Sequence, residues 1–256
     1  MKYRAEVDGL RALAVLPVMF FHAGFEFFSG GFVGVDVFFV ISGYLIATLI
    51  ISELEIGQFS ILKFYERRAR RILPALFLVM LLCIPFSYAL LSPSDFRDFG
   101  QSLVAVSIFS SNLLFWLESD YFDIATEFKP LLHTWSLAVE EQFYLIFPLL
   151  LLALWKLNNK ILMLVLLSLI FCMSIIYSHW GAYNAPSFNF YSITSRAWEL
   201  LIGVFLALFL WNYSSPKSIA LNQFLSILGL TAICLSIITF DAKTPFPSFY
   251  ALIPTL

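Results

Sequence analysis

Charged residues are scarce in this chain. They make up 12% of its 256 residues, whereas soluble globular proteins contain roughly a quarter. Hydrophobic residues reach 61% and the mean hydropathy is +0.88, so the composition excludes an ordinary soluble domain. No basic patch of the kind that binds nucleic acid is present. The composition predicts an all-α, polytopic membrane protein, and we treat residues 1–256 as one domain.

Cysteine and histidine are equally sparse, with three of each. Cys83, Cys172 and Cys234 each lie within an apolar run, which favours apolar filler over disulfides or metal ligands. No Cys/His cluster has the spacing of a zinc site, and we predict no metal. A cleavable signal is also missing, because Arg11 interrupts the first apolar run and no small-residue cleavage site follows it.

Long apolar runs predict about eight membrane-spanning helices. The expected spans are about 9–28, 33–52, 72–91, 137–155, 161–178, 197–211, 219–240 and a run that begins at 249. An excess of Lys and Arg marks the cytoplasmic side of a membrane. Arg4, Arg11 and the basic run 63–71 therefore place the N-terminus in the cytoplasm. The last run stops soon after it begins, so we expect a fragment of a longer protein.

The segment 103–117 is a weaker candidate, with ~15 residues where about 20 are needed for a full span. If it crosses fully, the acidic stretch 118–129 is cytoplasmic and Lys156 and Lys160 are external. If it is re-entrant, entering and leaving on the outer side, both groups of charges obey the positive-inside rule. We favour the re-entrant arrangement. Such segments are tolerated only where protein or a cavity lines them, which predicts a position beside the functional site.

Arg11 and His22 form the first candidate pair. Eleven residues separate them, which on a helix is ~16 Å along the axis and only ~20° around it. A charged and a titratable group on one face of a membrane helix face protein or a water-filled cavity. Histidine can take and return a proton near neutral pH. The alternatives are a histidine that donates to a neighbouring carbonyl and an arginine that snorkels at a helix end.

The basic run holds the second candidate site, formed by Arg67, Arg68, Arg70 and Arg71. Guanidinium groups grip phosphate in bidentate fashion, and residues three apart, such as Arg68 and Arg71, share a helix face and could hold one pyrophosphate. The alternative is a topology signal that contacts anionic lipid head groups.

Acidic residues at the expected span ends form the third group. Glu140 and Glu141 are adjacent and diverge by ~100°, so they cannot both face one partner. One could orient a protonated group such as His22 or Arg196 while the other caps the helix N-terminus, or both could be caps.

Arg196 and Glu199 stand three apart at another boundary, where a structural salt bridge and a substrate contact are equally plausible. Asp36 lies near the start of a span, as a membrane-edge carboxylate or as a first-turn residue favoured by the helix dipole.

Five motifs in a fixed order carry a family resemblance. They are Arg11 with His22, GVDVFFVISGY at 34–44, YERRARRILP at 65–74, HTWSLAVEEQFY at 133–144 and RAWELLIG at 196–203. The resemblance that they carry extends over essentially the whole chain. The set resembles acyltransferase family 3, the integral membrane O-acyltransferases that include O-antigen acetylases.

The resemblance implies about ten membrane helices in the bacterial inner membrane. It implies acyl-CoA, usually acetyl-CoA, as a cytoplasmic donor substrate and no permanently bound cofactor. The implied acceptor is a hydroxyl of a surface or periplasmic glycan, such as lipopolysaccharide O-antigen, or of a lipid-linked saccharide.

The resemblance also implies roles for individual residues. His22 is then the catalytic histidine and Arg11 its partner, and Arg68 and Arg71 match the family's arginine pair, although Arg67 and Arg70 have the same spacing. We add Glu141 to the catalytic set. The residues expected to support or contact the substrate are Asp36, His133, Glu140, Arg196 and Glu199.

A competing function is a transporter or flippase that moves a glycan or lipid carrier without acyl chemistry. It would explain buried charges equally well. Inverted repeats would favour it, and the sequence has no matching halves.

Overall fold

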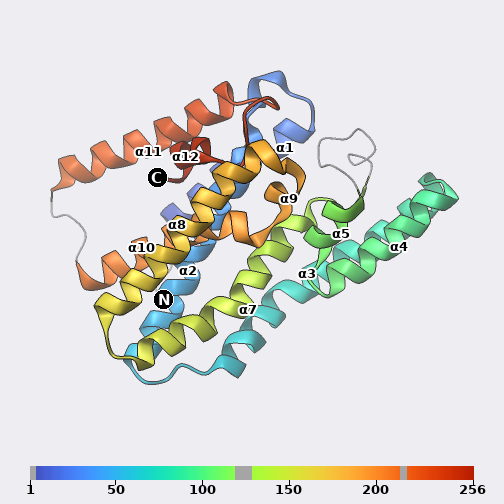
Figure 1. Cartoon of the computed structure of the whole chain (residues 1–256). Coiled ribbons are helices and arrows are strands. Elements are labelled where there is room, and N and C mark those ends of the chain that lie inside the picture. The colour runs from blue at the N-terminus through green and yellow to red at the C-terminus, as the bar shows by residue number, and fades with distance from the viewer. Residues whose placement is uncertain (1–3, 119–128, 214–217) are drawn as a thin grey trace. The chain divides into compact units, whose positions relative to one another are not determined.

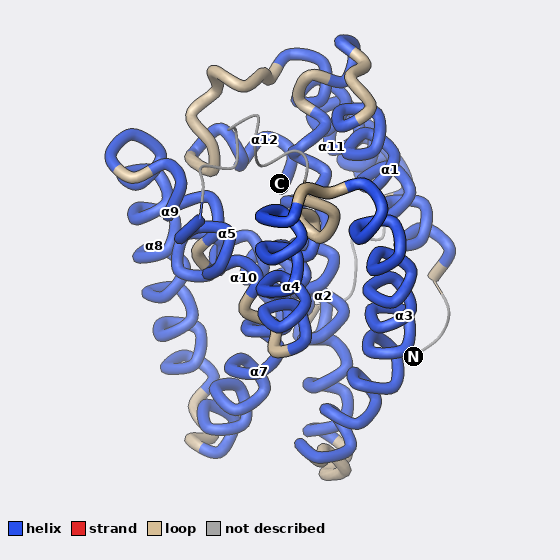
Figure 2. The backbone as a smooth tube through the Cα atoms, turned by 90° about the vertical axis from the view of Figure 1, so that its right-hand side faces the viewer, coloured by secondary structure: helices blue, strands red, loops and turns tan. Residues whose placement is uncertain are grey.

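A computed structural model describes residues 4–118, 129–213 and 218–256 of the chain. The described residues form helices joined by short loops and turns, without a strand among them (Figures 1 and 2). The acidic stretch expected at 118–129 lies almost entirely outside them. The prediction of an all-α architecture is confirmed.

Six stretches of the described chain are long and apolar enough to cross a membrane. Their principal helices are α2 (Gly34–Glu55), α3 (Ile61–Leu90), α7 (Thr134–Lys156), α8 (Lys160–Asn184), α10 (Ile193–Asn212) and α11 (Ile219–Thr239). They correspond to six of the eight expected spans, so the polytopic arrangement is confirmed.

The first expected span is shorter than predicted. Helix α1 (Ala5–His22) is an 18-residue helix that carries three charged side chains, and it is not one of the six. It stops well before residue 28 because Gly24 adopts φ = 79° and the Phe25 amide donates back to the Phe20 carbonyl at 3.1 Å. This is a glycine-terminated Schellman turn. The 3₁₀ turns η1 (Glu26–Phe28) and η2 (Gly31–Val33) then lead into α2.

The last expected span is represented by two short elements, η3 (Phe249–Ala251) and α12 (Leu252–Thr255). Neither has the length of a span. The turn α9 (Pro186–Tyr191) immediately precedes α10.

Helix α3 begins eleven residues earlier than the predicted span, at Ile61. The basic run, which was expected to precede the span, is therefore part of the same continuous helix. Its residues are mostly good helix formers, among them lysine, glutamate, arginine and alanine. An exposed i,i+4 pair between Glu66 and Arg70, at 2.9 Å, adds a few tenths of a kcal/mol, about 0.2–0.5.

The weak segment 103–117 is not one helix. It is divided between α4 (Pro93–Ser107) and α5 (Ser111–Glu118), with a break at which Phe109 has φ = 53°. Neither helix is among the six candidate spans. A single straight crossing by this segment is thus excluded, and its re-entry from the outer side stays a prediction.

The chain divides into two compact units. Unit one comprises Met1–Ser52, Asn159–Phe190 and Thr194–Leu256, and unit two comprises Glu53–Asn158 and Tyr191–Ile193.

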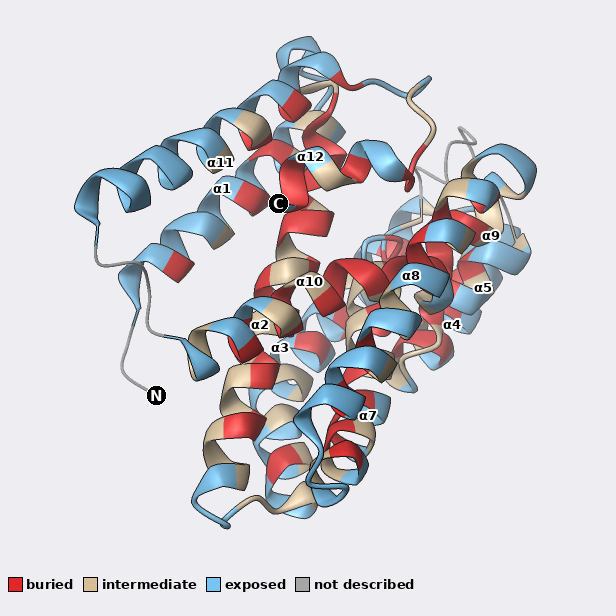
Figure 3. Cartoon of the chain, turned by 60° about the vertical axis from the view of Figure 1, so that its left-hand side comes forward, coloured by how far each residue is buried: buried red, intermediate tan, exposed pale blue. Residues whose placement is uncertain are grey.

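In unit one, α2 and α10 cross with their backbones in direct contact. A Cβ atom on Gly43 would collide with the carbonyl of Leu200, and one on Gly203 would collide with the carbonyl of Val40. Small residues allow this close approach between membrane helices. In Figure 3, α10 carries many buried positions, while α11 is almost wholly exposed, as expected of a helix that presents apolar side chains to lipid.

In unit two, the apolar core joins α3 to α4. Leu76 and Met80 of α3 pack with Phe99 and Val106 of α4 and with Leu131. Helix α5 packs against α7. These contacts bring α3, the α4–α5 break and α7 around one pocket.

Candidate active site

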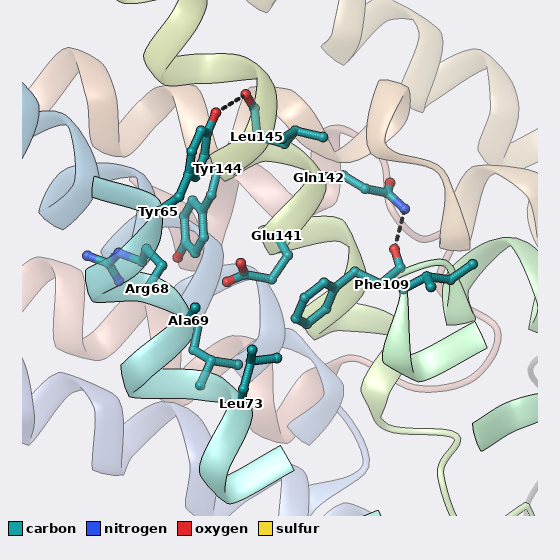
Figure 4. Close-up of a pocket in the computed structure, with 11 residues that line it drawn as sticks. Tyr65, Arg68, Ala69, Leu73, Phe109, Glu141, Gln142, Tyr144 and Leu145 are labelled. Carbon is teal, nitrogen blue, oxygen red and sulfur yellow. Dashed lines mark hydrogen bonds between the residues drawn. The ribbon is translucent and has the colours of Figure 1, made fainter. Parts of the chain in front are cut away.

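A pocket of about 260 Å³ lies in unit two, between α3 and α7 (Figure 4). The α3 side contributes Tyr65, Arg68, Ala69, Ile72 and Leu73, the α4–α5 break contributes Ile108 and Phe109, and α7 contributes Glu141, Gln142, Tyr144 and Leu145. Residues at spacings of three and four on α3 share one helix face, which explains why Tyr65, Arg68 and Ile72 all reach the pocket. Most of the wall is apolar or aromatic.

Arg68 is the only arginine of the basic run that lines this pocket. Its guanidinium lies 5.4 Å from the ring centre of Tyr144 and 5.8 Å from that of Phe64. Stacking on aromatic faces suits a planar guanidinium and holds it in place. The side chain is half-buried, so the pocket wall carries a fixed positive charge.

The other arginines of the run are exposed. Arg67 pairs with Glu53 at 2.9 Å and Arg70 pairs with Glu66 at 2.9 Å. Arg71 makes no ion pair with any residue that the structure describes. Of the predicted pair, Arg68 therefore lines the pocket and Arg71 does not.

Glu141 is the second charged residue of the pocket. In Figure 4 its carboxylate points across the pocket toward α3, where Arg68 lies. Its Oε1 atom is buried and has no hydrogen-bond partner among the described residues.

Glu140 is bound elsewhere, because the Tyr144 hydroxyl donates to its Oε2 at 3.2 Å. The two carboxylates thus diverge, as predicted. Neither caps the helix, since the first turn of α7 holds no acidic residue.

His133 occupies the N-cap position of α7 and makes no side-chain cap bond. Partial desolvation of its imidazole lowers the pKa of His133 below the usual value, which favours the neutral form.

The pocket wall at Phe109 is held by an amide pair that sequence reasoning missed. A positive φ is uncommon for a residue with a bulky side chain and costs roughly 1–3 kcal/mol. The Gln142 amide donates to the Phe109 carbonyl at 3.0 Å and to Asn112 Oδ1 at 2.8 Å, and Asn112 donates to the Tyr191 carbonyl at 3.0 Å. The only available signal was the presence of glutamine next to Glu141 in an apolar span.

Unit one contains a second cluster of charges, centred on Arg196. Its Nη1 donates to Asp36 Oδ1 at 2.6 Å and to Glu199 Oε1 at 3.1 Å, and its Nε donates to the Phe190 carbonyl at 3.2 Å. The rings of Phe190 and Phe246 lie 5.1 and 5.2 Å from the guanidinium carbon. All three charged side chains are at most 1% exposed.

The Arg196–Glu199 salt bridge considered from the sequence is thus present and fully buried. The partner of Asp36 was not foreseen, because 160 positions separate it from Arg196. Asp36 is a partner in an ion pair and more than a first-turn residue.

Arg11 and His22 both belong to α1, so the helical spacing between them is retained, with Pro17 in between. Arg11 is half-buried and pairs with Asp8 at 3.3 Å. His22 lies in the last turn, is exposed, and has its ring 5.0 Å from that of Phe21. The core of unit one therefore does not enclose the imidazole, and the expectation that this face of α1 points into the protein is not met at His22.

No group of three or more His, Cys, Asp or Glu side chains in the described part of the chain is arranged to hold a metal ion.

Comparison with known proteins identifies relatives. Residues 4–255 match a family model described as an acyltransferase domain. The chain is 35% identical to the peptidoglycan O-acetyltransferase OatA of Listeria monocytogenes over 97% of its own length and 40% of that protein. It is 39% identical to the O-acetyltransferase OatA of Staphylococcus aureus strain NCTC 8325 over 82% of its own length and 35% of that protein. The chain thus spans well under half of these relatives, and no solved structure matches it.

Proposed function

The chain belongs to the family of membrane acyltransferases whose domain model spans it, and from this we propose that it moves an acetyl group from acetyl-CoA to a hydroxyl of a cell-wall glycan. The observation that carries the proposal is the pocket in unit two, where Arg68 lines an apolar cavity and Glu141 Oε1 has no hydrogen-bond partner among the described residues. A largely apolar donor arm whose polar groups can pair with these two side chains is the ligand that such a pocket suits.

We place the protein in the bacterial cytoplasmic membrane with its N-terminus inside. The basic residues on the first turns of α3 then lie at the inner face, where coenzyme A is available. The exposed guanidinium of Arg71 is free of ion pairs with described residues and suits a phosphate of the donor. The acceptor is approached from the outer side, and similarity to the peptidoglycan O-acetyltransferase of Listeria monocytogenes favours peptidoglycan over O-antigen.

His22 is the residue proposed to act on the acyl group. In one route it takes the proton of the acceptor hydroxyl as that oxygen attacks the thioester carbonyl, and coenzyme A leaves as the thiol after gaining a proton. In the other, the unprotonated imidazole nitrogen attacks the thioester, and coenzyme A leaves as the thiol with the proton of the other ring nitrogen. The acetyl group then passes from His22 to the hydroxyl oxygen, and the hydroxyl proton returns to the imidazole. Its exposed position at the end of α1 supports both routes. Arg11, on the same helix, supplies a positive charge beside this path.

Transfer of labelled acetate tests the proposal. Membranes that contain the protein receive acetyl-CoA labelled in the acetyl group, and label on the cell-wall glycan is measured. The His22→Ala variant should lose about 100-fold or more of the activity, the scale of general acid–base catalysis, with an unchanged amount of folded protein. His179→Ala is the matched control, because it also removes an imidazole from unit one.

Full activity in the His22 variant would refute the assignment. Movement of the glycan or its lipid carrier across the membrane without label would identify a flippase instead. A labelled acetyl group trapped on His22 in the absence of acceptor would select the second route, and its absence during a single turnover would select the first.

A further inference from the structure

The Oε1 atom of Glu141 has no hydrogen-bond partner among the described residues. It is buried, accepts nothing, and belongs to a side chain directed into a cavity. Buried polar atoms are nearly always satisfied, and an unsatisfied charged group costs well over 1 kcal/mol. The neighbouring carboxylate, Glu140, already accepts a bond from Tyr144. Glu141 is therefore positioned to accept a hydrogen from a ligand.

The ligand group must also be able to accept a hydrogen bond from Arg68, which lines the same pocket. A carboxylate acceptor beside a guanidinium donor matches a group that has both an N–H and a C=O, which is an amide. A phosphate is a poor match, because the negative charge of Glu141 would repel it at short range. Ala69, Ile72 and Leu73 add an apolar surface that suits methylene groups.

Pocket size narrows the choice further. Sites for drug-sized ligands usually occupy about 300–1,000 Å³, while this cavity has about 260 Å³. A whole coenzyme A thioester cannot fit, but a slim portion of it can. The portion that is slim, uncharged and carries amides is the pantetheine arm.

We propose that the pocket binds the amide-bearing arm of the donor, with Glu141 accepting from an amide N–H and Arg68 donating to an amide C=O. Recognition of the phosphates then falls to Arg71, outside the pocket. This assignment rests on the proposed function for the identity of the donor. It separates two arginines that the sequence spacing treats as one phosphate clamp, and it makes Glu141 a positioning residue.

Two donors and two sites of substitution test the assignment. Acetyl-CoA carries the phosphates, and S-acetylpantetheine carries the same amides without the phosphates. Glu141→Leu should raise the KM for both donors about 10- to 100-fold, the size expected for a hydrogen bond to a charged group. Glu141→Gln keeps an acceptor oxygen and should raise it less. Arg71→Gln should raise the KM for acetyl-CoA and leave that for S-acetylpantetheine unchanged.

Binding of pantetheine itself, followed by calorimetry on the detergent-solubilised full chain, separates this inference from the proposed function. If neither donor supports transfer but pantetheine binds and Glu141→Leu abolishes its binding, the function fails and the pocket assignment stands. Glu55→Gln, at an exposed position, is the matched control.

Three results would overturn the assignment. The first is absence of pantetheine binding to the unmodified protein. The second is a Glu141→Leu variant in which the KM rises for acetyl-CoA only and not for S-acetylpantetheine. The third is a variant that binds pantetheine normally and yet loses transfer, which would place Glu141 in the chemistry.

Discussion

The two arginine clusters of this protein contain the same kinds of group and behave in opposite ways. Arg196 in unit one binds two carboxylates, Asp36 and Glu199, and all three are sealed from solvent. Arg68 in unit two also has two carboxylates on a neighbouring helix, but Glu140 is held by Tyr144 and Glu141 faces a cavity. The first cluster is sealed in the core, where Asp36 Oδ2 and Glu199 Oε2 also lack a hydrogen-bond partner among the described residues, whereas the open acceptor of the second cluster, Glu141 Oε1, can be reached from the cavity.

This difference distinguishes a charge that stabilises the fold from a charge that is available to bind a ligand. A buried charge that is paired with good geometry is costly to disrupt, because removal of one partner leaves the others uncompensated. A half-buried charge that stacks on rings retains its donors for a ligand. Four substitutions test this distinction.

Arg196→Met should have the largest effect on stability. It leaves Asp36 and Glu199 buried without their cation, and should lower the free energy of unfolding by about 3–5 kcal/mol. Thermal unfolding in detergent and the yield of folded protein measure the loss. The triple variant Asp36→Leu, Arg196→Met, Glu199→Leu should recover much of it, because apolar replacement of a whole buried ion cluster is often neutral. A single variant as stable as the unmodified protein would contradict the interpretation of a sealed cluster.

Gln142→Leu should have the next largest effect. It removes the hydrogen-bond donor of the Phe109 carbonyl and of Asn112, at a cost of about 1–3 kcal/mol. The backbone at Phe109, which forms part of the pocket wall, then loses the contact that holds it. We expect a lower unfolding temperature together with weaker donor binding. Gln101→Leu on the exposed side of α4 is the matched control. A loss of stability with unchanged donor affinity would show that the wall at Phe109 does not shape the pocket.

Arg68→Met should change the free energy of unfolding by about 1 kcal/mol or less. It forfeits two ring contacts, each worth about 0.5–1 kcal/mol, and relieves the desolvation of a half-buried charge. Donor affinity should fall in the same variant. Calorimetric unfolding and donor titration on one preparation compare the two quantities. Destabilisation as large as that of Arg196→Met would mean that Arg68 stabilises the fold in the way that Arg196 does.

Glu66→Gln should have the smallest effect, about 0.5 kcal/mol or less, because its pair with Arg70 is a solvent-exposed i,i+4 pair. The difference from the unmodified protein should vanish in high salt, where exposed charges are screened. Unfolding curves at two salt concentrations measure it. Persistence of the difference at high salt would mean that this pair is more than a surface contact.

Much of the fold follows from apolar run length, since a helix in lipid must satisfy its own backbone. That argument found all six candidate spans, three of them to within three residues at both ends. It failed where a single residue ends a helix or where polar residues continue one. Gly24 ends α1 early, and the arginines at the start of α3 continue the helix beyond the apolar run.

The sequence predicts which residues belong to the candidate site but not how they are arranged in space. Arg68, Glu141 and His22 were all chosen from motif and spacing. Helical spacing could pair Arg196 with Glu199 but not with Asp36, because contacts between helices far apart in the chain depend on packing. The positive φ at Phe109 and the amide pair that holds it had no sequence signal beyond one glutamine.

By itself, the sequence determined that this is a helical membrane protein with a basic helix start, a histidine at the end of its first helix and ordered acyltransferase motifs. Apolar run length and helical spacing are local quantities, so they can be read from the chain alone. Only the tertiary structure sets which charges are sealed in the core and which line a cavity. That outcome depends on the glycine-mediated crossing of α2 and α10 and on the wall at Phe109, where segments distant in sequence either enclose a charge cluster or leave an acceptor facing a cavity.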